Sequence, residues 1–260
     1  MNTSLEVLFA PTEFAALEQR DLSGTVCAVF DVLRATSSMV TALANGASAI
    51  VPVAEIPVAL GICDRDPRIL LAGERDGLRI QSDLTGGIAF DFGNSPREFT
   101  REKVNGKTIA MTTTNGTRAL RACARAKTVL AASFLNLRAT ANCVADEQNL
   151  ILVCSGTLDQ TAYEDVLAAG AMCDLLWSTH SAGAVADSAR IARELYLLEK
   201  ADLLAAVSKS RNGGRLLANP DLREDVAFCV QRDLFTLVAE LGKDGAVRSR
   251  NPLHAGARRL

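Results

Sequence analysis

Acidic, basic and hydroxyl side chains gather at four places where an apolar stretch of the chain stops. The first is the segment DVLRATS at residues 31–37, in which Asp31 ends an apolar run and Arg34 precedes Thr36 and Ser37. A carboxylate at such a position is costly to bury unless it is paired, hydrogen-bonded or bound to a metal. The segment indicates an anion or metal site, with an Asp31–Arg34 ion pair beside an ordinary helix cap as the alternative.

The second cluster is the segment AGERDG at residues 72–77. It again places an acid and an arginine, Glu74 and Arg75, at the end of an apolar run. Taken alone, such a segment is more typical of a solvated turn than of a site. It gains weight only if the fold brings it beside the other clusters.

The third cluster is the segment TTTNGT at residues 112–117, followed by Arg118. A helix that begins at Asn115 or Gly116 presents free backbone N–H groups and the positive end of its dipole, and glycine allows a ligand to approach closely. The segment predicts a phosphate cradle to which Arg118 adds charge. A cap in an ordinary loop is the alternative.

The fourth cluster is the segment CSGTLDQTAYED at residues 154–165. It leaves an apolar run through Ser155 and Gly156 and ends with two adjacent acids, Glu164 and Asp165. Adjacent carboxylates raise each other's pKa unless a cation lies near them. Glu164 also fits a helix-capping box, which is its alternative role, whereas Asp165 takes no part in such a box.

The elements that must position these clusters follow from hydrophobic periodicity. Short apolar runs alternate with amphipathic segments, and this pattern predicts β-α units around a mostly parallel or mixed sheet with helices on both faces. The predicted strands are Leu5–Phe9, Thr25–Phe30, Ala49–Val53, Ile69–Ala72, Thr108–Met111, Thr128–Ala131 and Leu150–Cys154. The pattern also predicts a helical C-terminal portion, with helices at 184–198, 202–209 and 225–241.

We expect residues 1–260 to form one α/β catalytic unit, with about 1–177 and 178–260 as the lobes if the chain divides. Capping boxes at Ser95–Glu98 and Thr161–Glu164 and a helix stop at Asn45–Gly46 mark helix ends. A long surface loop is expected at Asp76–Gly93, because four glycines occur there with little periodicity.

All four clusters follow predicted strands, so the carboxyl ends of parallel strands would bring them to one crevice. Carboxylates are ligands that Mg²⁺ prefers, and Mg²⁺ commonly bridges one or two of them to a substrate phosphate. The crevice therefore predicts phosphoryl transfer. The chain has no P-loop, G-x-S-x-G or G-x-G-x-x-G motif, no C-x-x-C pair for zinc, and only His180 and His254 as histidines, neither within a catalytic motif.

The composition limits the classes of partner. With 28 basic and 30 acidic residues, the net charge of −2 gives no reason to expect nucleic acid. The N-terminal stretch lacks a basic region and an apolar signal core, and no later run would span a bilayer, so we expect a cytoplasmic protein without a membrane partner. Seven scattered cysteines suit reduced core thiols. A homodimer is the default expectation.

Taken in order along the chain, these motifs resemble those of the 2-phosphosulfolactate phosphatase family, enzymes of coenzyme M biosynthesis and their bacterial relatives. The residues that carry the resemblance are DVLRATS (31–37), GER (73–75), GNSP (93–96), TTTNGT (112–117), CSG (154–156) with Glu164-Asp165, and DVAFC (225–229). The segment 82–89 makes one loop longer than the family's usual spacing, which leaves the substrate preference open.

The resemblance implies an α/β hydrolase that uses Mg²⁺ to cleave the phosphate ester of a small acidic metabolite, 2-phosphosulfolactate. A phosphatase for another phosphorylated hydroxy acid and a non-catalytic protein that binds such an acid are the alternatives. The attacking group is water or a covalent Asp or Ser. The expected metal ligands, direct or through water, are Asp31, Glu74, Glu164 and Asp165; the expected catalytic residues are Asp31, Arg34, Glu74 and Asp165; the expected substrate-binding residues are Arg34, Thr36, Ser37, Arg75, Asn94, Ser95, Thr113, Thr114, Asn115, Gly116, Thr117, Arg118, Ser155 and Gly156.

Overall fold

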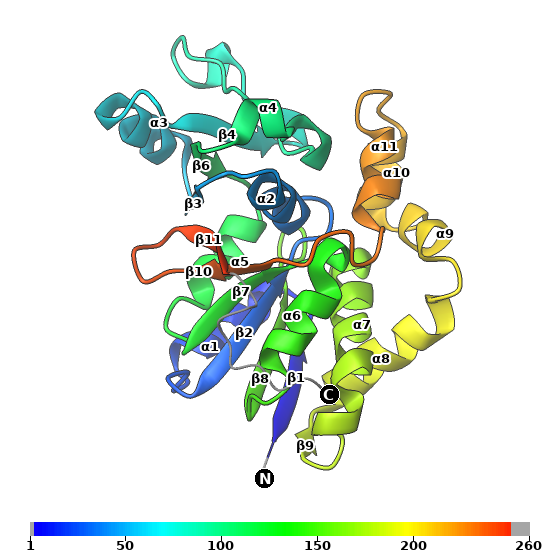
Figure 1. Ribbon diagram of the computed structural model, residues 1–260. Coiled ribbons are helices and arrows are strands. Elements are labelled where there is room, and N and C mark those ends of the chain that lie inside the picture. The colour runs from blue at the N-terminus through cyan, green and yellow to red at the C-terminus, as the bar shows by residue number, and fades with distance from the viewer. Residues whose placement is uncertain (1–2, 251–260) are drawn as a thin grey trace.

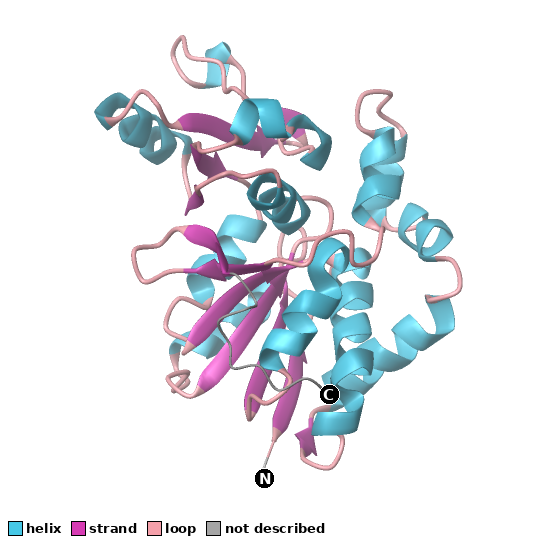
Figure 2. Ribbon diagram, viewed as in Figure 1, coloured by secondary structure: helices cyan, strands magenta, loops and turns pink. Residues whose placement is uncertain are grey.

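The protein is represented by a computed structural model that describes residues 3–250. It is an α/β protein in which one mixed sheet carries helices on both faces (Figures 1 and 2), as predicted. Each predicted strand is present: β1 (Ser4–Leu8), β2 (Thr25–Phe30), β3 (Ala49–Val53), β4 (Leu70–Arg75), β6 (Thr108–Thr112), β7 (Thr128–Ala132) and β8 (Asn149–Cys154). The shorter strands β5 (Leu78–Arg79), β9 (Ala184–Val185), β10 (Val238–Leu241) and β11 (Val247–Arg250) join them.

The strand order is β5-β4-β6-β3-β11-β10-β7-β2-β8-β1-β9. Strands β4, β6 and β3 form a small parallel block, and β7, β2, β8, β1 and β9 form a large one. The hairpin β10–β11 pairs antiparallel with both blocks. Three antiparallel pairings thus separate β3 from β7, so the two blocks run in opposite directions along the sheet.

The strand ends of both blocks nevertheless meet. Strand β11 pairs with β3 at one position only, Val247 with Ile50, so the sheet is not held flat there. Figure 1 shows the small block standing above the large block instead of continuing its plane. The carboxyl ends of β4 and β6 therefore come to face those of β2 and β8.

Strand β2 shows why the large block is covered on both sides. All six of its residues are buried. Val26, Ala28 and Phe30 point into one apolar cluster, and Cys27 and Val29 point into another. Because side chains alternate along a strand, a continuous apolar run of this kind requires a packed layer on each face.

Helices supply these layers. Helices α6, α7 and α8 contact one another and the large block, and α2 and α5 lie on the opposite face, while α3 packs on the small block. The helices are α1 (Phe14–Glu18), α2 (Ala35–Ala44), α3 (Ile56–Arg65), α4 (Arg101–Val104), α5 (Gly116–Ala122), α6 (Leu137–Val144), α7 (Tyr163–His180), α8 (Asp187–Glu199), α9 (Leu203–Ser208), α10 (Arg211–Leu217) and α11 (Arg223–Cys229). Helix α2 ends before Asn45 and Gly46, as predicted, and α7 spans residue 177.

The C-terminal portion is helical as predicted, but the single helix expected over 225–241 is wrong in its second half. Helix α11 stops at Cys229 and the chain then forms β10. Asp233 takes a left-handed backbone conformation, with φ of 57°. Val238 and Ala239 are buried where β10 enters the sheet beside β7. Pairing with the sheet overrides a spacing that reads as helical in the sequence.

Both predicted capping boxes are also wrong, because their side chains bind elsewhere. The Ser95 hydroxyl donates to Asp225 instead of capping the short 3₁₀ turn that follows it. Helix α7 starts at Tyr163, has Ala162 at its N-cap, and receives no side-chain cap. Polar residues that look local in the sequence are used for contacts between distant segments.

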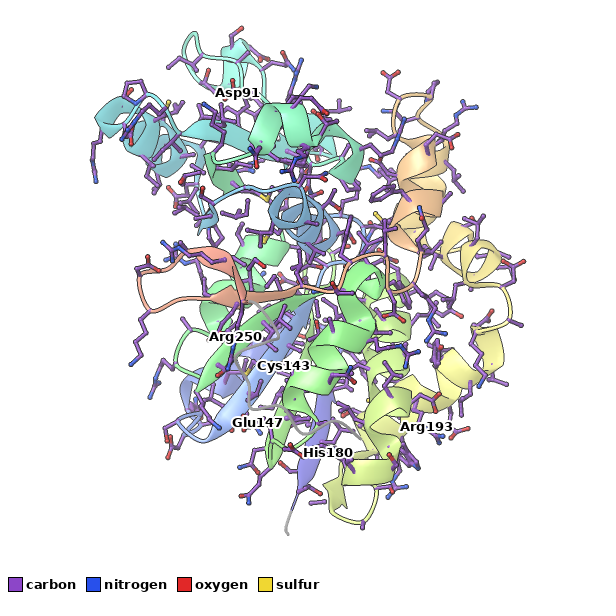
Figure 3. The ribbon with its side chains drawn as sticks, in the orientation of Figure 1. Asp91, Cys143, Glu147, His180, Arg193 and Arg250 are labelled. Carbon is purple, nitrogen blue, oxygen red and sulfur yellow. The ribbon has the colours of Figure 1, made fainter. Side chains whose placement is uncertain are left out.

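His180 lies far from the carboxyl ends of β2, β4, β6 and β8. It is fully buried, and its ring contacts the hydroxyl of Thr179 and the carbonyl oxygen of Glu147 near the amino ends of the large block's strands (Figure 3). His254 lies outside the described residues. The cysteines are free thiols, as predicted. Among residues 3–250, no helix combines the length and apolar character needed to cross a bilayer.

Candidate active site at the converging strand ends

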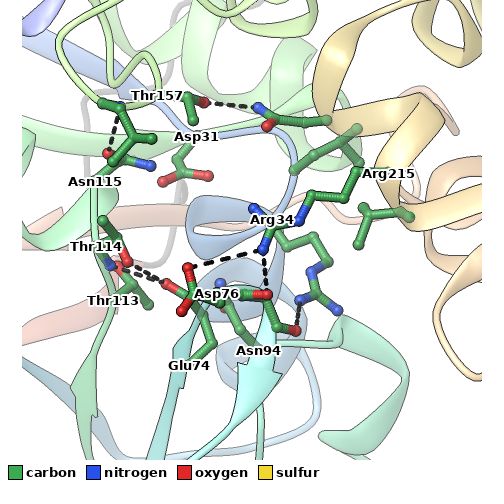
Figure 4. Close-up of a pocket in the computed structure, with 15 residues that line it drawn as sticks. Asp31, Arg34, Glu74, Asp76, Asn94, Thr113, Thr114, Asn115, Thr157 and Arg215 are labelled. Carbon is green, nitrogen blue, oxygen red and sulfur yellow. Dashed lines mark hydrogen bonds and ion pairs between the residues drawn. The ribbon is translucent and has the colours of Figure 1, made fainter. Parts of the chain in front are cut away.

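A cavity of about 100 Å³ opens where the strand ends of the two blocks meet (Figure 4). Residues from all four sequence clusters line it. They are Asp31, Leu33, Arg34, Glu74, Asp76, Gly77, Thr113, Thr114, Asn115, Thr157 and Leu158, joined by Asn94. The lining also includes residues that stand in no cluster and no motif of the resemblance: Asn212, Arg215 and Leu216.

Asp31 lies just beyond β2 and lines the cavity. Its Oδ1 accepts a hydrogen bond of 3.0 Å from the N–H of Ala35 in the first turn of α2. Burial raises the pKa of Asp31 to about 7, and the charges of Glu74 and Glu164 act in the same direction. Such a value lets a carboxyl group exchange a proton near neutral pH. The alternative of an Asp31–Arg34 ion pair does not occur.

Asp165 joins two strand exits of the large block. Its Oδ1 accepts from the N–H of Val32 at 2.8 Å, and its Oδ2 accepts from the N–H of Gly156 at 3.1 Å. Burial, followed by the negative charges of Asp31 and Glu164, raises its pKa well above the usual range. Asp165 therefore ties the exit of β2 to that of β8, beneath the cavity.

Glu164 keeps one oxygen without a partner. Its Oε1 accepts from Nδ2 of Asn212 at 2.6 Å, whereas Oε2 is buried and has no hydrogen-bond partner. The same amide of Asn212 donates to the hydroxyl of Thr157 at 2.8 Å. An unsatisfied buried polar group costs about 1–3 kcal/mol, and more if charged, so this oxygen can accept a hydrogen bond from a donor or hold a cation.

Glu74 accepts hydrogen bonds from the segments that follow β4 and β6 in the small block. Its Oε1 accepts from both the N–H and the hydroxyl of Thr114 at 2.9 Å, and its Oε2 accepts from the N–H of Gly77 at 2.8 Å. Both carboxylate oxygens are thus occupied by protein donors. Glu74 holds the turn after β6 and the start of the long loop at fixed places around the cavity.

Arg34 is buried beside the cavity. Its Nη1 donates to Oδ2 of Asp225 at 2.8 Å, and its Nη2 donates to the carbonyl oxygen of Gly77 at 2.7 Å. Asp225 is itself fully buried and also accepts from Ser95 at 2.6 Å. The carboxylate of Asp225 therefore fixes the Arg34 guanidinium, and three N–H groups of that guanidinium remain for other acceptors.

The turn after β6 approaches Asp31 closely because Gly116 has no side chain. A Cβ atom at this position would lie 2.6 Å from the Cβ of Ala35 and 2.7 Å from Oδ2 of Asp31. Within the turn, the hydroxyl of Thr117 donates to the carbonyl oxygen of Thr113, and so it serves the backbone. The Asn115 side-chain oxygen accepts from the N–H of Leu158 at 3.5 Å, across the cavity mouth.

Several expected binding residues have their polar groups turned elsewhere. Thr36 donates to the carbonyl oxygen of Asp31, and Ser37 donates to that of Val32. Arg75 donates to the Glu74 carbonyl oxygen and the Thr112 hydroxyl, and Arg118 pairs with exposed Asp159 at 2.6 Å. Of these described side chains none lines the cavity; the expected binding residues that also stay outside its lining are Ser95, Gly116, Thr117, Ser155 and Gly156.

Sequence reasoning missed the part of the site that comes from the C-terminal helices. Helix α10 supplies Asn212 and Arg215, and α11 supplies Asp225. Asp225 stands in one of the motifs that carried the resemblance, so a signal for it existed. Asn212 and Arg215 follow no strand and stand in no such motif, and only the folded chain brings them to the cavity.

The donor set around the cavity fits a magnesium ion held partly by water. Within residues 3–250, no three His, Cys, Asp or Glu side chains form a ready-made metal cage. Mg²⁺ does not require one, because it is commonly bound by one or two carboxylates together with waters and substrate phosphate. Asp31 lines the cavity, and Glu164 has a free buried oxygen, so these two acids fit such an ion.

The family model for 2-phosphosulpholactate phosphatase matches residues 13–244. The chain belongs to this family. It is 39% identical over 213 residues to a probable 2-phosphosulfolactate phosphatase of Thermotoga petrophila, which covers 82% of this chain and 87% of the relative. The corresponding protein of Caldanaerobacter subterraneus is 37% identical over 242 residues, 91% of this chain and 95% of the relative. That of Pseudothermotoga lettingae is 36% identical over 244 residues, covering 94% and 98%.

The range matched to the 2-phosphosulpholactate phosphatase family contains the whole cavity, from Asp31 to Leu216, and also Asp225. The extra segment 82–89 does not line the cavity, and only Asp76 and Gly77 of the long loop do. Segment 82–89 therefore forms no part of the cavity wall.

Proposed function

We propose that this chain hydrolyses the phosphate ester of 2-phosphosulfolactate to sulfolactate and phosphate, with Mg²⁺ as the cofactor. One observation carries the proposal. In the described part of the chain, three buried side-chain polar atoms lack a hydrogen-bond partner: Asn94 Oδ1, Ser155 Oγ and Glu164 Oε2. Asn94 lines the cavity, and Glu164 and Ser155 stand in the fourth cluster, of which Thr157 and Leu158 line it. A polar, charged ligand at the cavity would relieve the desolvation cost of the Asn94 oxygen, and a cation held between Asp31 and Glu164 would relieve that of the Glu164 oxygen. The names of the relatives supply the substrate.

In this reaction a water molecule attacks phosphorus, the bond between phosphorus and the ester oxygen breaks, and that oxygen takes up the proton that the water molecule releases. Asp31 lines the cavity, where its carboxylate would help to hold Mg²⁺. Arg34 is fixed by Asp225 and offers its remaining N–H groups to phosphate oxygens. Positive charge held in place around the transferred group is commonly the largest catalytic contribution.

A bound Mg²⁺ would neutralise the phosphate and stabilise charge as it develops on the phosphoryl oxygens. Asp31 and Glu164 would hold it. Glu74 and Asp165 already use both carboxylate oxygens for backbone N–H groups, and we assign them to positioning the strand ends, with any metal contact through water. The product fits a step of the coenzyme M type, in which sulfolactate is consumed further.

The experiment that tests this function measures phosphate release from a panel of phosphorylated three-carbon acids, with and without a sulfonate. The wild-type protein should be most active on 2-phosphosulfolactate, and Asp31→Asn should lower kcat by orders of magnitude while the protein stays folded. Preference for an ester without sulfonate would identify a phosphatase for another hydroxy acid. Tight binding of every ester without phosphate release would identify a binding protein.

A further inference from the structure

Arg215 on α10 is a positive charge at the cavity that the protein itself neutralises poorly. Among the described lining residues, Arg34 and Arg215 are the cationic ones. The side chain of Arg215 is 54% exposed, and its Nη2 lies 4.0 Å from Oδ1 of Asp76, whose side chain is 97% exposed. Nη2 of Arg215 also donates a hydrogen bond to the backbone carbonyl oxygen of Asp76. An exposed pair of this kind contributes little, so the guanidinium is available to a ligand.

The two guanidinium groups converge on one wall of the cavity. A Cβ atom at Gly77 would lie 3.9 Å from Nη2 of Arg215 and 3.9 Å from Nη2 of Arg34. Figure 4 shows the Arg215 side chain running from α10 into the cavity. The two positively charged guanidinium groups repel each other, and an anion bound between them would be attracted to both. Only Arg34 has a buried carboxylate partner, Asp225.

Helix α10 holds this arginine at a defined distance from the reacting groups. Asn212, three residues before Arg215, donates both to Glu164 and to Thr157. A Cβ atom at Gly213 would lie 2.0 Å from the carbonyl oxygen of Val207, so the helix packs closely on the segment before it. The backbone of α10 is therefore anchored, and the Arg215 side chain extends from a fixed point.

We propose that Arg215 determines specificity by binding an acid group on the carbon skeleton of the substrate, the one that is not transferred. This inference rests on the proposed function. The transferred phosphate lies at the wall formed by Asp31, Arg34 and the Thr113–Asn115 turn, and the remaining acid lies at Arg215, next to Arg34. A guanidinium group suits this task because its N–H groups form paired, charge-assisted hydrogen bonds to the oxygens of a carboxylate or sulfonate.

The test compares Arg215→Gln and Arg215→Lys with the wild type. Lys209→Gln removes one exposed positive charge from the neighbouring chain and serves as the matched control. The substrates are 2-phosphosulfolactate, 2-phospholactate without the sulfonate, phosphorylated isethionate without the carboxylate, and phenyl phosphate without either. We measure kcat and KM for each ester and the melting temperature of each variant.

We expect Arg215→Gln to reduce the preference for acid-bearing esters over phenyl phosphate at least tenfold, mainly through KM. Arg215→Lys should keep part of that preference, and Lys209→Gln should keep it within twofold. The ester whose KM rises most identifies the acid group as sulfonate or carboxylate. An equal loss on all four esters, or an unchanged preference, overturns the proposal while the phosphatase function stands.

A binding experiment tests the role of Arg215 even if the proposed phosphatase function is wrong. If the wild type releases phosphate from none of the esters, calorimetric titration with sulfolactate and with lactate still measures the Arg215 contact. Arg215→Gln should then weaken the binding of sulfolactate at least tenfold relative to the wild type. Equal dissociation constants for the two proteins overturn the inference.

Discussion

Nη1 of Arg34 lies 2.8 Å from Oδ2 of Asp225, although 191 residues separate them along the chain. Both side chains are buried. The contact joins the turn after β2 to helix α11, so a charge at the cavity is held in place by a carboxylate from the C-terminal helices. Removing one partner of a buried ion pair costs about 3–5 kcal/mol, because the remaining charge stays unpaired.

Replacing Asp225 with asparagine should therefore release Arg34 from its fixed position. We expect Asp225→Asn to lower both the melting temperature and kcat/KM for 2-phosphosulfolactate, the latter by tenfold or more. Glu224→Gln, an exposed acid on the same helix, is the matched control and should change neither quantity by much. Wild-type kcat/KM in a destabilised Asp225→Asn protein would show that this pair serves folding alone.

Gly116 should tolerate no side chain. A methyl group there would press on both Ala35 and the Asp31 carboxylate. We expect Gly116→Ala to cut kcat by tenfold or more and to destabilise the protein by about 1–3 kcal/mol, as overpacking does. Gly61→Ala is the control, because a Cβ atom there meets nothing within 4 Å. Equal kcat values for the two variants would contradict the close approach of the turn to Asp31.

Glu164 should matter for the affinity of the metal ion. Its buried Oε2 lacks a partner, and the proposal gives that oxygen to Mg²⁺. We expect Glu164→Gln to raise the Mg²⁺ concentration needed for half-maximal activity by roughly tenfold or more. Glu194→Gln, on the exposed side of α8, is the control. An unchanged Mg²⁺ requirement in Glu164→Gln would remove this residue from the metal site.

The raised pKa of Asp31 predicts a pH-dependent stability. Burial moves this pKa from its ordinary value of 3.8 to about 7, so between these pH values the folded protein binds more protons than the unfolded chain. The contribution of Asp31 to the free energy of unfolding is then present at acid pH and is lost as the pH rises toward 7. In EDTA, the wild type should lose stability relative to Asp31→Asn over this range. Parallel unfolding curves for the two proteins would rule out the shift.

The sequence predicted the strands well because β2, β3 and β8 consist almost entirely of apolar residues, and β2, β6 and β8 end at abrupt polar segments. Those polar segments located Asp31, Glu74 and the turn after β6 at one cavity. We expected these segments to meet because the carboxyl ends of parallel strands lie at one edge of a sheet. That explanation was incomplete, since the two parallel blocks run in opposite directions and their ends meet through the bend at β11. Nothing in a local pattern records such a bend.

The rest of the site could not be predicted from local patterns. Ser95 looked like a helix cap and instead binds Asp225, which is distant in the sequence. Arg75 and Arg118 looked suitable for an anion because they follow strand ends, yet their guanidinium groups already bind protein oxygens, those of Glu74 and Thr112 for Arg75 and that of Asp159 for Arg118. Arg215 lies between the predicted helices at 202–209 and 225–241, and no local pattern marked it. Long-range packing decides which arginine side chains reach the cavity.

We propose that the cavity between the two blocks is a magnesium-dependent phosphatase site. This proposal can be tested by measuring phosphate release from 2-phosphosulfolactate by the wild-type protein in Mg²⁺, in EDTA, and in EDTA followed by excess Mg²⁺. We expect release in Mg²⁺, loss of release in EDTA, and recovery when Mg²⁺ is restored, with Asp31→Asn inactive throughout. Undiminished release in EDTA, or near-normal release by Asp31→Asn, would rule out a magnesium site at Asp31.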